Sequence, residues 1–268
     1  MTKELNGREL ASFVKERQAE LLRERKKEGK RAPKLLILRD SDNPVIVKYV
    51  NLKKRYGEDI GVEVEDRLVQ NNDELKNVIL EANKDTEIDG MIVQLPLKDP
   101  AKTEEIVNLI EPVKDMDGLA DNEKPVFESA TATAINWLLA GNGVDLKNGQ
   151  KNALVGYGRL VGRPLERMWG NSGIKVDVFR HDSNLAVLKD YDVIVSATGV
   201  PHLIKSEMVK AGAVVVDAGT ASENGVLVGD VDEEVRERQD LSAITPKVGG
   251  VGPLTVSVLF DNVIRAAN

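Results

Sequence analysis

The sequence predicts an α/β protein of two domains, in which helices cover parallel sheets. Short apolar runs alternate with amphipathic stretches as far as Ile110. The loop-rich segment 112–125 interrupts this alternation, and a second series of strands and helices restarts at Asn152 with six candidate strands. Parallel strands need crossover connections, so alternation of strands and helices predicts parallel sheets, and six strands suffice for a dinucleotide-binding fold.

The composition excludes several classes of protein. The chain of 268 residues has 41% hydrophobic and 30% charged residues and a net charge of −7, which argues against binding to nucleic acid or to an anionic membrane. It has no Cys and only two His, His181 and His202, so disulfides, thiolate nucleophiles, and zinc sites built from Cys or several His are excluded. The N-terminus lacks an apolar signal core and no apolar run reaches membrane-spanning length, so we expect a cytoplasmic protein that needs no metal.

The first series begins with an amphipathic helix. Its apolar stripe is formed by Leu10, Phe13, Val14 and Leu21, and the charged run 23–31 that follows is interpreted as a solvated face and a turn. Turn residues at 40–44 and an Asn-Asn-Asp cap at 71–73 mark the starts of later helices. The predicted strands are 34–39, 62–69 and 90–97, and the predicted helices are 45–56, 71–82 and 103–110.

The second series follows an apolar helix at 131–140. Strands are predicted within 152–158, 175–180, 192–199, 213–219 and 226–231, and helices around Leu165, around 206–211 and from Leu254 to Ala266. A last strand at Ala243 leads into the loop 246–253, which holds three glycines and two prolines. Glycine lets the backbone approach a ligand and proline makes the loop rigid, although an ordinary strand-to-helix connection would look the same.

The restart at Asn152 carries a glycine-rich turn, Gly156-Tyr157-Gly158-Arg159-Leu160-Val161-Gly162. Such a turn at the start of a helix presents amides and a favourable dipole to a pyrophosphate. The spacing is GxGxxxG rather than GxGxxG, so the alternative is a plain tight turn between strand and helix.

The residues near the end of the next strand bear on the choice between NAD and NADP. NAD-specific sites carry an acid about 20 residues after the turn. Asp177 lies near that count but within the strand, whereas Arg180 suits a 2′-phosphate through a charge-assisted hydrogen bond. Arg180 therefore favours NADP, with a solvated loop cation as the alternative.

Five polar residues of the first series are candidates for chemistry. Tyr49 and Lys53 are four residues apart on a predicted helix and share a face, where a ring could stack a flat substrate beside a proton donor and acceptor. Gln94 ends a predicted strand, where ligands of open α/β sheets gather and where an amide could bias the charge of a lysine. Asp115 and Asp117 are either site residues or turn formers.

These residues lie in segments that together resemble the bifunctional methylenetetrahydrofolate dehydrogenase/methenyltetrahydrofolate cyclohydrolase family. The matching segments occur in family order and span nearly the whole chain. They are DNP…YVNLK (42–53), DGMIVQLPL (89–97), KDMDG (114–118), VGRP (161–164), LVGDV (227–231) and TPKVGGVGPLTV (245–256).

The resemblance implies a role for each matched position. Lys53 would be the general acid/base, with Gln94 helping to set its protonation. Tyr49 would stack on the aminobenzoate ring of the folate, and Asp117 would bind the pterin. Gly250 and Pro253 would contact the folate, so the implied substrates are tetrahydrofolates. The implied cofactor is NADP, with NAD possible, held by Gly156, Tyr157, Gly158, Arg159, Val161, Gly162, Arg180, Thr198, Gly199 and Gly249.

The resemblance also implies the organisation of the chain. Residues 1–126 and 252–268 would form a catalytic, folate-binding domain, and residues 127–251 a Rossmann-like NAD(P)-binding domain. The final helix would return to the first domain, and the protein would be a homodimer.

The chain departs from the family pattern on the cofactor side. The Gly-Arg-Ser cofactor loop of the family is Gly-Tyr-Gly here, at 156–158. The chain also departs from the family pattern in two other segments, Ser129-Ala130-Thr131-Ala132 and Gly219-Thr220-Ala221-Ser222. The folate-side residues are intact. The sequence thus predicts the two activities and leaves open three alternatives: NAD dependence, the loss of one activity, and a nucleotide-binding protein without catalysis.

Overall fold

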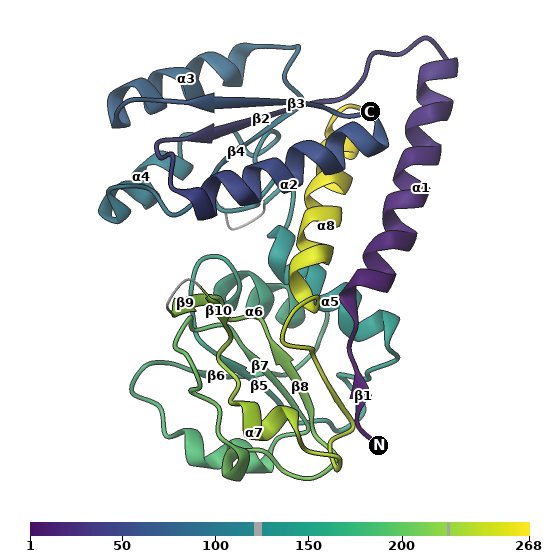
Figure 1. Cartoon of the computed structure of the whole chain (residues 1–268), viewed down its shortest axis with the longest axis vertical. Coiled ribbons are helices and arrows are strands. Elements are labelled where there is room, and N and C mark those ends of the chain that lie inside the picture. Colours follow the sequence, from purple (N-terminus) through teal and green to yellow (C-terminus); the bar gives the residue numbers. More distant parts are fainter. Residues whose placement is uncertain (121–124, 224–225) are drawn as a thin grey trace. The chain divides into compact units, whose positions relative to one another are not determined.

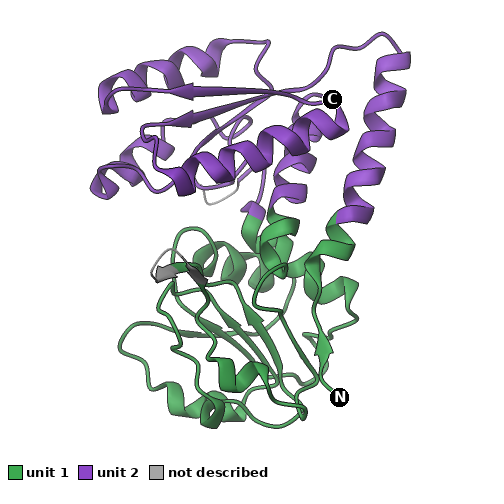
Figure 2. Ribbon diagram, viewed as in Figure 1, with its two compact units in different colours: residues 1–11, 131–255 green, residues 12–130, 256–268 purple. Residues whose placement is uncertain are grey.

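The chain forms two compact units, each assembled from separate stretches of sequence. The computed structural model describes residues 1–120, 125–223 and 226–268, so 121–124 of the predicted linker lie outside the described residues. Unit 1 consists of residues 1–11 and 131–255, and unit 2 of residues 12–130 and 256–268 (Figure 2).

Unit 2 is built on a three-stranded parallel sheet of order β3-β2-β4 (Figure 1). On one face of this sheet, Leu36 and Leu38 of β2 pack with apolar side chains of two helices in a single core. Leu35 and Ile37 alternate with them and are equally buried, so both faces of the sheet are covered. The elements wholly within unit 2 are β2 (Lys34–Arg39), α2 (Pro44–Ile60), β3 (Glu63–Leu68), α3 (Asn72–Lys84), β4 (Gly90–Val93), η1 (Pro100–Lys102) and α4 (Thr103–Val107).

The helix starts in unit 2 follow the predicted capping chemistry. Asn43 accepts a hydrogen bond from the amide of Val45, and Pro44 occupies the first turn of α2, where its missing N–H costs nothing. Asn71 caps α3 by accepting from the amide of Glu74 at 2.9 Å. These two helices therefore begin where the sequence predicts.

The prediction for the first helix was wrong about which side chains it buries. α1 (Gly7–Lys27) leaves Phe13 and Leu21 exposed by 65% and 48%. Gln18 is buried instead, because its amide donates to the carbonyl of Ser257 at 2.9 Å and its Oε1 accepts from Tyr56 Oη at 2.8 Å. A polar side chain that finds these partners can occupy a core position that the apolar pattern alone would not assign to it.

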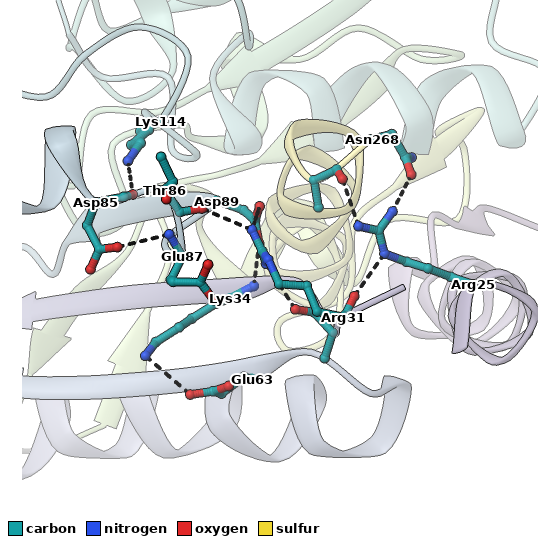
Figure 3. Close-up of polar contacts among 12 residues, drawn as sticks. Arg25, Arg31, Lys34, Glu63, Asp85, Thr86, Glu87, Asp89, Lys114 and Asn268 are labelled. Atoms are coloured by element: carbon teal, nitrogen blue, oxygen red, sulfur yellow. Dashed lines mark hydrogen bonds and ion pairs between the residues drawn. The ribbon is translucent and has the colours of Figure 1, made fainter. Parts of the chain in front are cut away.

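A network of polar side chains lies at the amino ends of the strands of the unit 2 sheet (Figure 3). Arg31 donates two hydrogen bonds to Asp89, at 2.7 and 2.8 Å, and Asp89 also accepts from the amide of Lys34. Arg25 binds the side chain of Asn268 and the carbonyl of Ala267. Two arginines of the charged run expected to be solvated thus anchor a strand and the C-terminus.

Unit 1 contains a six-stranded parallel sheet of order β1-β11-β8-β7-β5-β6 (Figure 1). Along the chain, β6 is added on one side of β5 and β7 on the other, so the strand order reverses between β5 and β7. The sheet strands are β1 (Lys3–Glu4), β5 (Asn152–Val155), β6 (Asp177–Phe179), β7 (Val193–Ser196), β8 (Val214–Asp217) and β11 (Ala243–Ile244). The other elements of unit 1 are α6 (Gly162–Asn171), η2 (Leu185–Asp190), η3 (Ser206–Met208), β9 (Ala221–Glu223), β10 (Val226–Val228) and α7 (Glu233–Arg236).

Two predictions for the second series need correction. The strand within 226–231 does not join the main sheet, because β10 pairs with β9 in a separate antiparallel hairpin. The sixth strand of the main sheet is β1, which is too short and too charged to carry an apolar signal. The helix expected around 206–211 is only the short 3-10 turn η3.

The first residues of the chain lie in a different unit from the one expected. Residues 1–126 were expected in one domain, whereas residues 1–11 belong to unit 1, because β1 extends its sheet by pairing with β11. The unit boundary therefore falls within α1. It also falls at the start of α5 (Ala130–Gly141) and within α8 (Val251–Ala266).

Candidate active site

Unit 2 brings Lys53 and Gln94 together at the carboxyl end of β4. Lys53 lies on α2, and its Nζ donates to Gln94 Oε1 at 2.6 Å. The two residues are 41 positions apart in the sequence. Ligands of open α/β sheets bind beyond the carboxyl ends of the strands, so this amine lies where a substrate is expected.

The orientation of Gln94 is fixed by its surroundings. Its backbone amide donates to the carbonyl of Leu38 at 2.8 Å, continuing the β2–β4 ladder, and its side chain is buried. Its Nε2 donates to the carbonyl of Leu95 at 3.0 Å. Because the nitrogen of the amide is engaged there, the oxygen faces the lysine as an acceptor.

The segment from Lys114 to Met116 runs beside β4 and belongs to the KDMDG motif, which carries Asp115 and Asp117. Met91 of β4 donates its amide to the carbonyl of Lys114 at 2.8 Å. Asp115 accepts hydrogen bonds from the amides of Gly118 and Ala120, so this aspartate is a turn former. Burial raises the pKa of Asp115 to about 6.

Lys53 and Asp117 form an electrostatically coupled pair. As whole residues both are partly exposed, but their charged ends lie deep enough for burial to dominate. Burial lowers the pKa of Lys53, against the attraction of Asp117, and raises the pKa of Asp117, against the attraction of Lys53. An amine with a lowered pKa is neutral in a larger fraction of molecules near neutral pH, which suits it to accept a proton.

Tyr49 lies one helical turn before Lys53 on α2, as the spacing predicts. Its side chain is partly exposed. Tyr49, Lys53, Gln94 and Asp117 are therefore all in unit 2, as is Asp115, and Lys53 interacts with both Gln94 and Asp117.

The glycine-rich turn of unit 1 lies at the carboxyl end of β5, beside the point where the strand order reverses. In doubly wound sheets this is the position of a nucleotide. A Cβ added to Gly162 would lie 2.3 Å from the carbonyl oxygen of Gly156, so the start of α6 packs closer to the turn than any other residue type allows. A Cβ at Gly158 would meet nothing within 4 Å. The turn is thus tightly wound with open space at Gly158, which fits the approach of a pyrophosphate.

The second predicted cofactor segment, Thr198-Gly199, follows β7, the strand next to β5. The amide of Thr198 donates to Asp230 Oδ2 at 2.6 Å, and the hydroxyl of Ser196 donates to the same oxygen at 2.7 Å. Asp230 is fully buried. Asp230 belongs to the LVGDV motif but was not among the residues predicted to have a role; its two hydrogen bonds fix the end of β7.

Arg180 follows β6 and lies against the glycine-rich turn. Its guanidinium carbon is 4.2 Å from the centre of the Tyr157 ring. The hydroxyl of Tyr157 donates to Glu166 Oε2 at 2.6 Å, and this bond raises the pKa of the tyrosine. Asp177, the alternative partner for a ribose hydroxyl, accepts from Tyr191 Oη at 2.8 Å.

The glycine-rich loop after β11 is supported by the N-terminus of the chain. The amide of Gly7 donates to the carbonyl of Gly249 at 2.9 Å, and a Cβ on Gly7 would lie 1.8 Å from the carbonyl oxygen of Gly250. Arg8 covers Gly249. Gly7 and Arg8 were not predicted from the sequence, where the signal is an Asn-Gly pair at the start of a helix. Pro253 lies in the first turn of α8.

Two features of the fold and sites together define the class of protein. A parallel doubly wound sheet with a glycine-rich turn at its reversal point is typical of dinucleotide-binding units. Here it shares a chain with a second parallel α/β unit that holds a lysine of lowered pKa, so the fold and sites are those of a two-unit, nucleotide-dependent enzyme.

The chain belongs to the tetrahydrofolate dehydrogenase/cyclohydrolase family. Residues 5–117 match the model of the family's catalytic domain, and residues 129–268 match that of its NAD(P)-binding domain. The chain is 36% identical to the bifunctional protein FolD of Aquifex aeolicus, over 98% of this chain and 94% of that protein.

Solved structures agree with this assignment. The bifunctional enzyme FolD, methylenetetrahydrofolate dehydrogenase/cyclohydrolase, from Campylobacter jejuni superposes with a TM-score of 0.91 at 32% identity, covering 100% of this chain and 99% of that one. The methylenetetrahydrofolate dehydrogenase-cyclohydrolase of Trypanosoma brucei, complexed with NADP and an inhibitor, gives a TM-score of 0.90 at 28% identity, covering 99% and 97%. The family and the α/β fold with an NAD(P)-binding domain, expected from the sequence, are confirmed.

Proposed function

We propose that this chain oxidises 5,10-methylenetetrahydrofolate to 5,10-methenyltetrahydrofolate with NADP⁺ and hydrolyses the product to 10-formyltetrahydrofolate. It is accordingly an oxidoreductase and a hydrolase of one-carbon metabolism. The observation that carries the proposal is the hydrogen bond between Lys53 and Gln94 at the carboxyl end of β4. The amine of Lys53 lies in the unit that holds most of the residues matching the catalytic domain of the family, and burial lowers its pKa.

In the dehydrogenase step, bound NADP⁺ would supply the hydride acceptor for the methylene carbon of the folate. The contribution of the protein to this step is orientation. Tyr49 stacks against the aminobenzoate ring, Asp117 binds the pterin, and Gly250 and Pro253 contact the folate. The turn from Gly156 to Gly162 holds the cofactor together with the residues after β6 and β7 and Gly249.

In the cyclohydrolase step water attacks the methenyl carbon. Neutral Lys53 accepts a proton from this water as the carbon–oxygen bond forms, which converts the cationic substrate into a neutral adduct. The bond from that carbon to N5 then breaks, N5 takes the hydroxyl proton, and the formyl group stays on N10. Lys53 releases its proton to solvent. Burial, which lowers the pKa of Lys53, favours the form of the amine that starts this sequence.

The choice of NADP over NAD is part of the proposal and is supported by Arg180. It lies directly after β6, and the nearby acid Asp177 is bonded to Tyr191. The predicted homodimer and cytoplasmic location stay predictions. Among the described residues no helix is long and apolar enough to cross a membrane, and no three acidic, His or Cys side chains are grouped as metal ligands.

An absorbance assay tests the proposal. Purified protein is mixed with 5,10-methylenetetrahydrofolate and either NADP⁺ or NAD⁺, and hydrolysis of 5,10-methenyltetrahydrofolate is followed separately. We expect reduction of NADP⁺ in preference to NAD⁺, and ring opening in the second assay. Preference for NAD⁺ would contradict the cofactor assignment, and turnover in only one assay would mean that the chain has lost the other activity. No turnover in either would overturn the proposal.

A further inference from the structure

The end of β6 is where a doubly wound fold reads the ribose of a bound adenosine. An acid there accepts a hydrogen bond from the 2′-hydroxyl of NAD, and an arginine accommodates the 2′-phosphate of NADP. In this chain the residue directly after β6 is Arg180, and it is exposed. Arg180 lies beside a second arginine and a tyrosine ring.

Two arginines from different elements lie over the ring of one tyrosine. The guanidinium of Arg180 is 4.2 Å from the centre of the Tyr157 ring, and that of Arg163, in the first turn of α6, is 5.9 Å from it. In the part of the chain that the structure describes, neither arginine is ion-paired with a carboxylate. Each is a guanidinium group near the glycine-rich turn that is not ion-paired within the described residues, although the carboxylate of Glu166 lies on the hydroxyl of the same tyrosine. Such guanidinium groups can bind a phosphate through charge-assisted hydrogen bonds.

The tyrosine is itself held in place. Its hydroxyl donates to Glu166 Oε2 at 2.6 Å, and Glu166 lies one turn after Arg163 on α6. The ring is therefore fixed at its far end while its face carries Arg180. A guanidinium stacked on a ring keeps its N–H groups free at its edge and loses less rotamer entropy when they bind a ligand.

We propose that Tyr157 is a positioning residue for cofactor specificity: its ring holds Arg180, beside Arg163, as the site for the 2′-phosphate of an adenosine ribose. This inference rests on the proposed function. The phosphate dianion would pair with Arg180, with Arg163 as a second cation near the same ring, whereas a ribose with a free 2′-hydroxyl would form no ion pair with Arg180. Tyr157 thereby contributes to the preference for NADP without touching the phosphate.

Titration calorimetry on the full-length protein tests the site without turnover. The probes are adenosine 2′,5′-bisphosphate and AMP, which differ only in the 2′-phosphate. We expect the bisphosphate to bind at least about tenfold more tightly than AMP, the effect of one good charge-assisted contact. This ratio should fall as ionic strength rises, because the arginines are exposed.

Four variants separate the parts of the site. Arg180→Gln should remove the preference for the bisphosphate. Tyr157→Leu should reduce it about threefold or more, whereas Tyr157→Phe, which keeps the ring, should retain most of it. Lys175→Gln, which removes an exposed charge just before β6, is the matched control and should leave the ratio unchanged. A far-ultraviolet circular dichroism spectrum and a thermal unfolding midpoint close to those of wild type show that each variant is folded.

Two outcomes would overturn the inference. One is a wild-type protein that binds both probes equally. The other is a preference that Arg180→Gln abolishes but Tyr157→Leu leaves intact, since Arg180 would then act without the ring. Failure of the proposed function is distinguishable: a protein that prefers the bisphosphate yet turns over no folate has the phosphate site and lacks the enzyme activity.

Discussion

Among single residues, Lys53 combines the features expected of a proton-transfer group. It is held by one amide oxygen at 2.6 Å, is coupled to Asp117, and has a pKa lowered by burial. Lys48 lies on the same helix but is exposed. Lys53 is suited to catalysis because of the environment that the folded chain creates around its amine, since a lysine side chain alone has no such property.

Replacing Lys53 tests its role. Lys53→Met keeps the length of the side chain and removes the amine, and we expect hydrolysis of 5,10-methenyltetrahydrofolate to fall by about 10²–10⁴-fold, the usual contribution of a positioned acid or base. The measurement is the absorbance decrease of the methenyl substrate. Lys48→Met on the exposed part of α2 is the control and should hydrolyse normally. Near-normal hydrolysis by Lys53→Met would exclude Lys53 as the base.

Gln94 should control the pH dependence of the same step. If neutral Lys53 is the competent form, hydrolysis rises as pH increases through the pKa of Lys53, which burial has lowered. Gln94→Ala removes an acceptor that stabilises the ammonium, so the acid limb should move to lower pH. Gln94→Glu places a negative charge there, so the limb should move up by about 1 unit or more. pH–rate profiles of the two variants check this, and coincident limbs would refute the tuning role.

Among the elements, short segments from distant parts of the chain complete the structures that carry the site. β1 is only two residues long, yet it adds an edge strand to the unit 1 sheet, and the residues after it support the loop at Gly249 and Gly250. In unit 2 the segment Lys114–Met116 runs beside β4 in the same way. Such segments have weak local signals because their neighbours in space stabilise them.

Gly7 is the clearest test of this support. In Gly7→Ala the new methyl group would lie 1.8 Å from the carbonyl oxygen of Gly250, so the N-terminal segment or the loop must move. We expect a loss of about 1–3 kcal/mol in the free energy of unfolding, as in overpacked cores. Urea unfolding is the measurement. The control is Gly170→Ala in α6, where a Cβ meets nothing within 4 Å and alanine should be neutral or stabilising by up to about 1 kcal/mol.

For the whole molecule, the notable feature is that neither unit is a continuous stretch of chain. The boundary is crossed after Ala11, after Ala130 and after Thr255. The second half of α8 belongs to unit 2, where Phe260 stacks on Tyr56 with ring centres 4.9 Å apart and Asn262 donates to the carbonyl of Met116 at 3.0 Å. The end of the chain is thus part of the core that holds α2 in place.

Phe260 should therefore be a large contributor to the stability of unit 2. It is fully buried, and Phe260→Ala should lower the free energy of unfolding by about 3–5 kcal/mol. Phe13→Ala makes the same change at a side chain that is 65% exposed and should stay within about 0.5 kcal/mol of wild type. Denaturant melts of both variants decide the question; similar losses would show that Phe260 is not a core contact in solution.

Much of the fold could be predicted from the sequence because its signals are local. Apolar runs placed β2 and β5, and asparagine caps placed the starts of α2 and α3. The burial of Phe13 and Leu21 was predicted wrongly because an apolar stripe does not indicate whether other elements cover that face of the helix. The sheet membership of β10 was predicted wrongly because the pattern of a strand does not indicate which strand it pairs with.

By itself the sequence determined the alternation of elements, the family and the candidate residues, since these depend on local patterns and on motifs in order. Only the tertiary structure decided that the amine of Lys53 meets the oxygen of Gln94 and that the ring of Tyr157 carries Arg180. It also decided that Gln18 is buried. Such contacts join residues far apart in the chain, and how far burial removes water from a charged group depends on the packing of the whole unit.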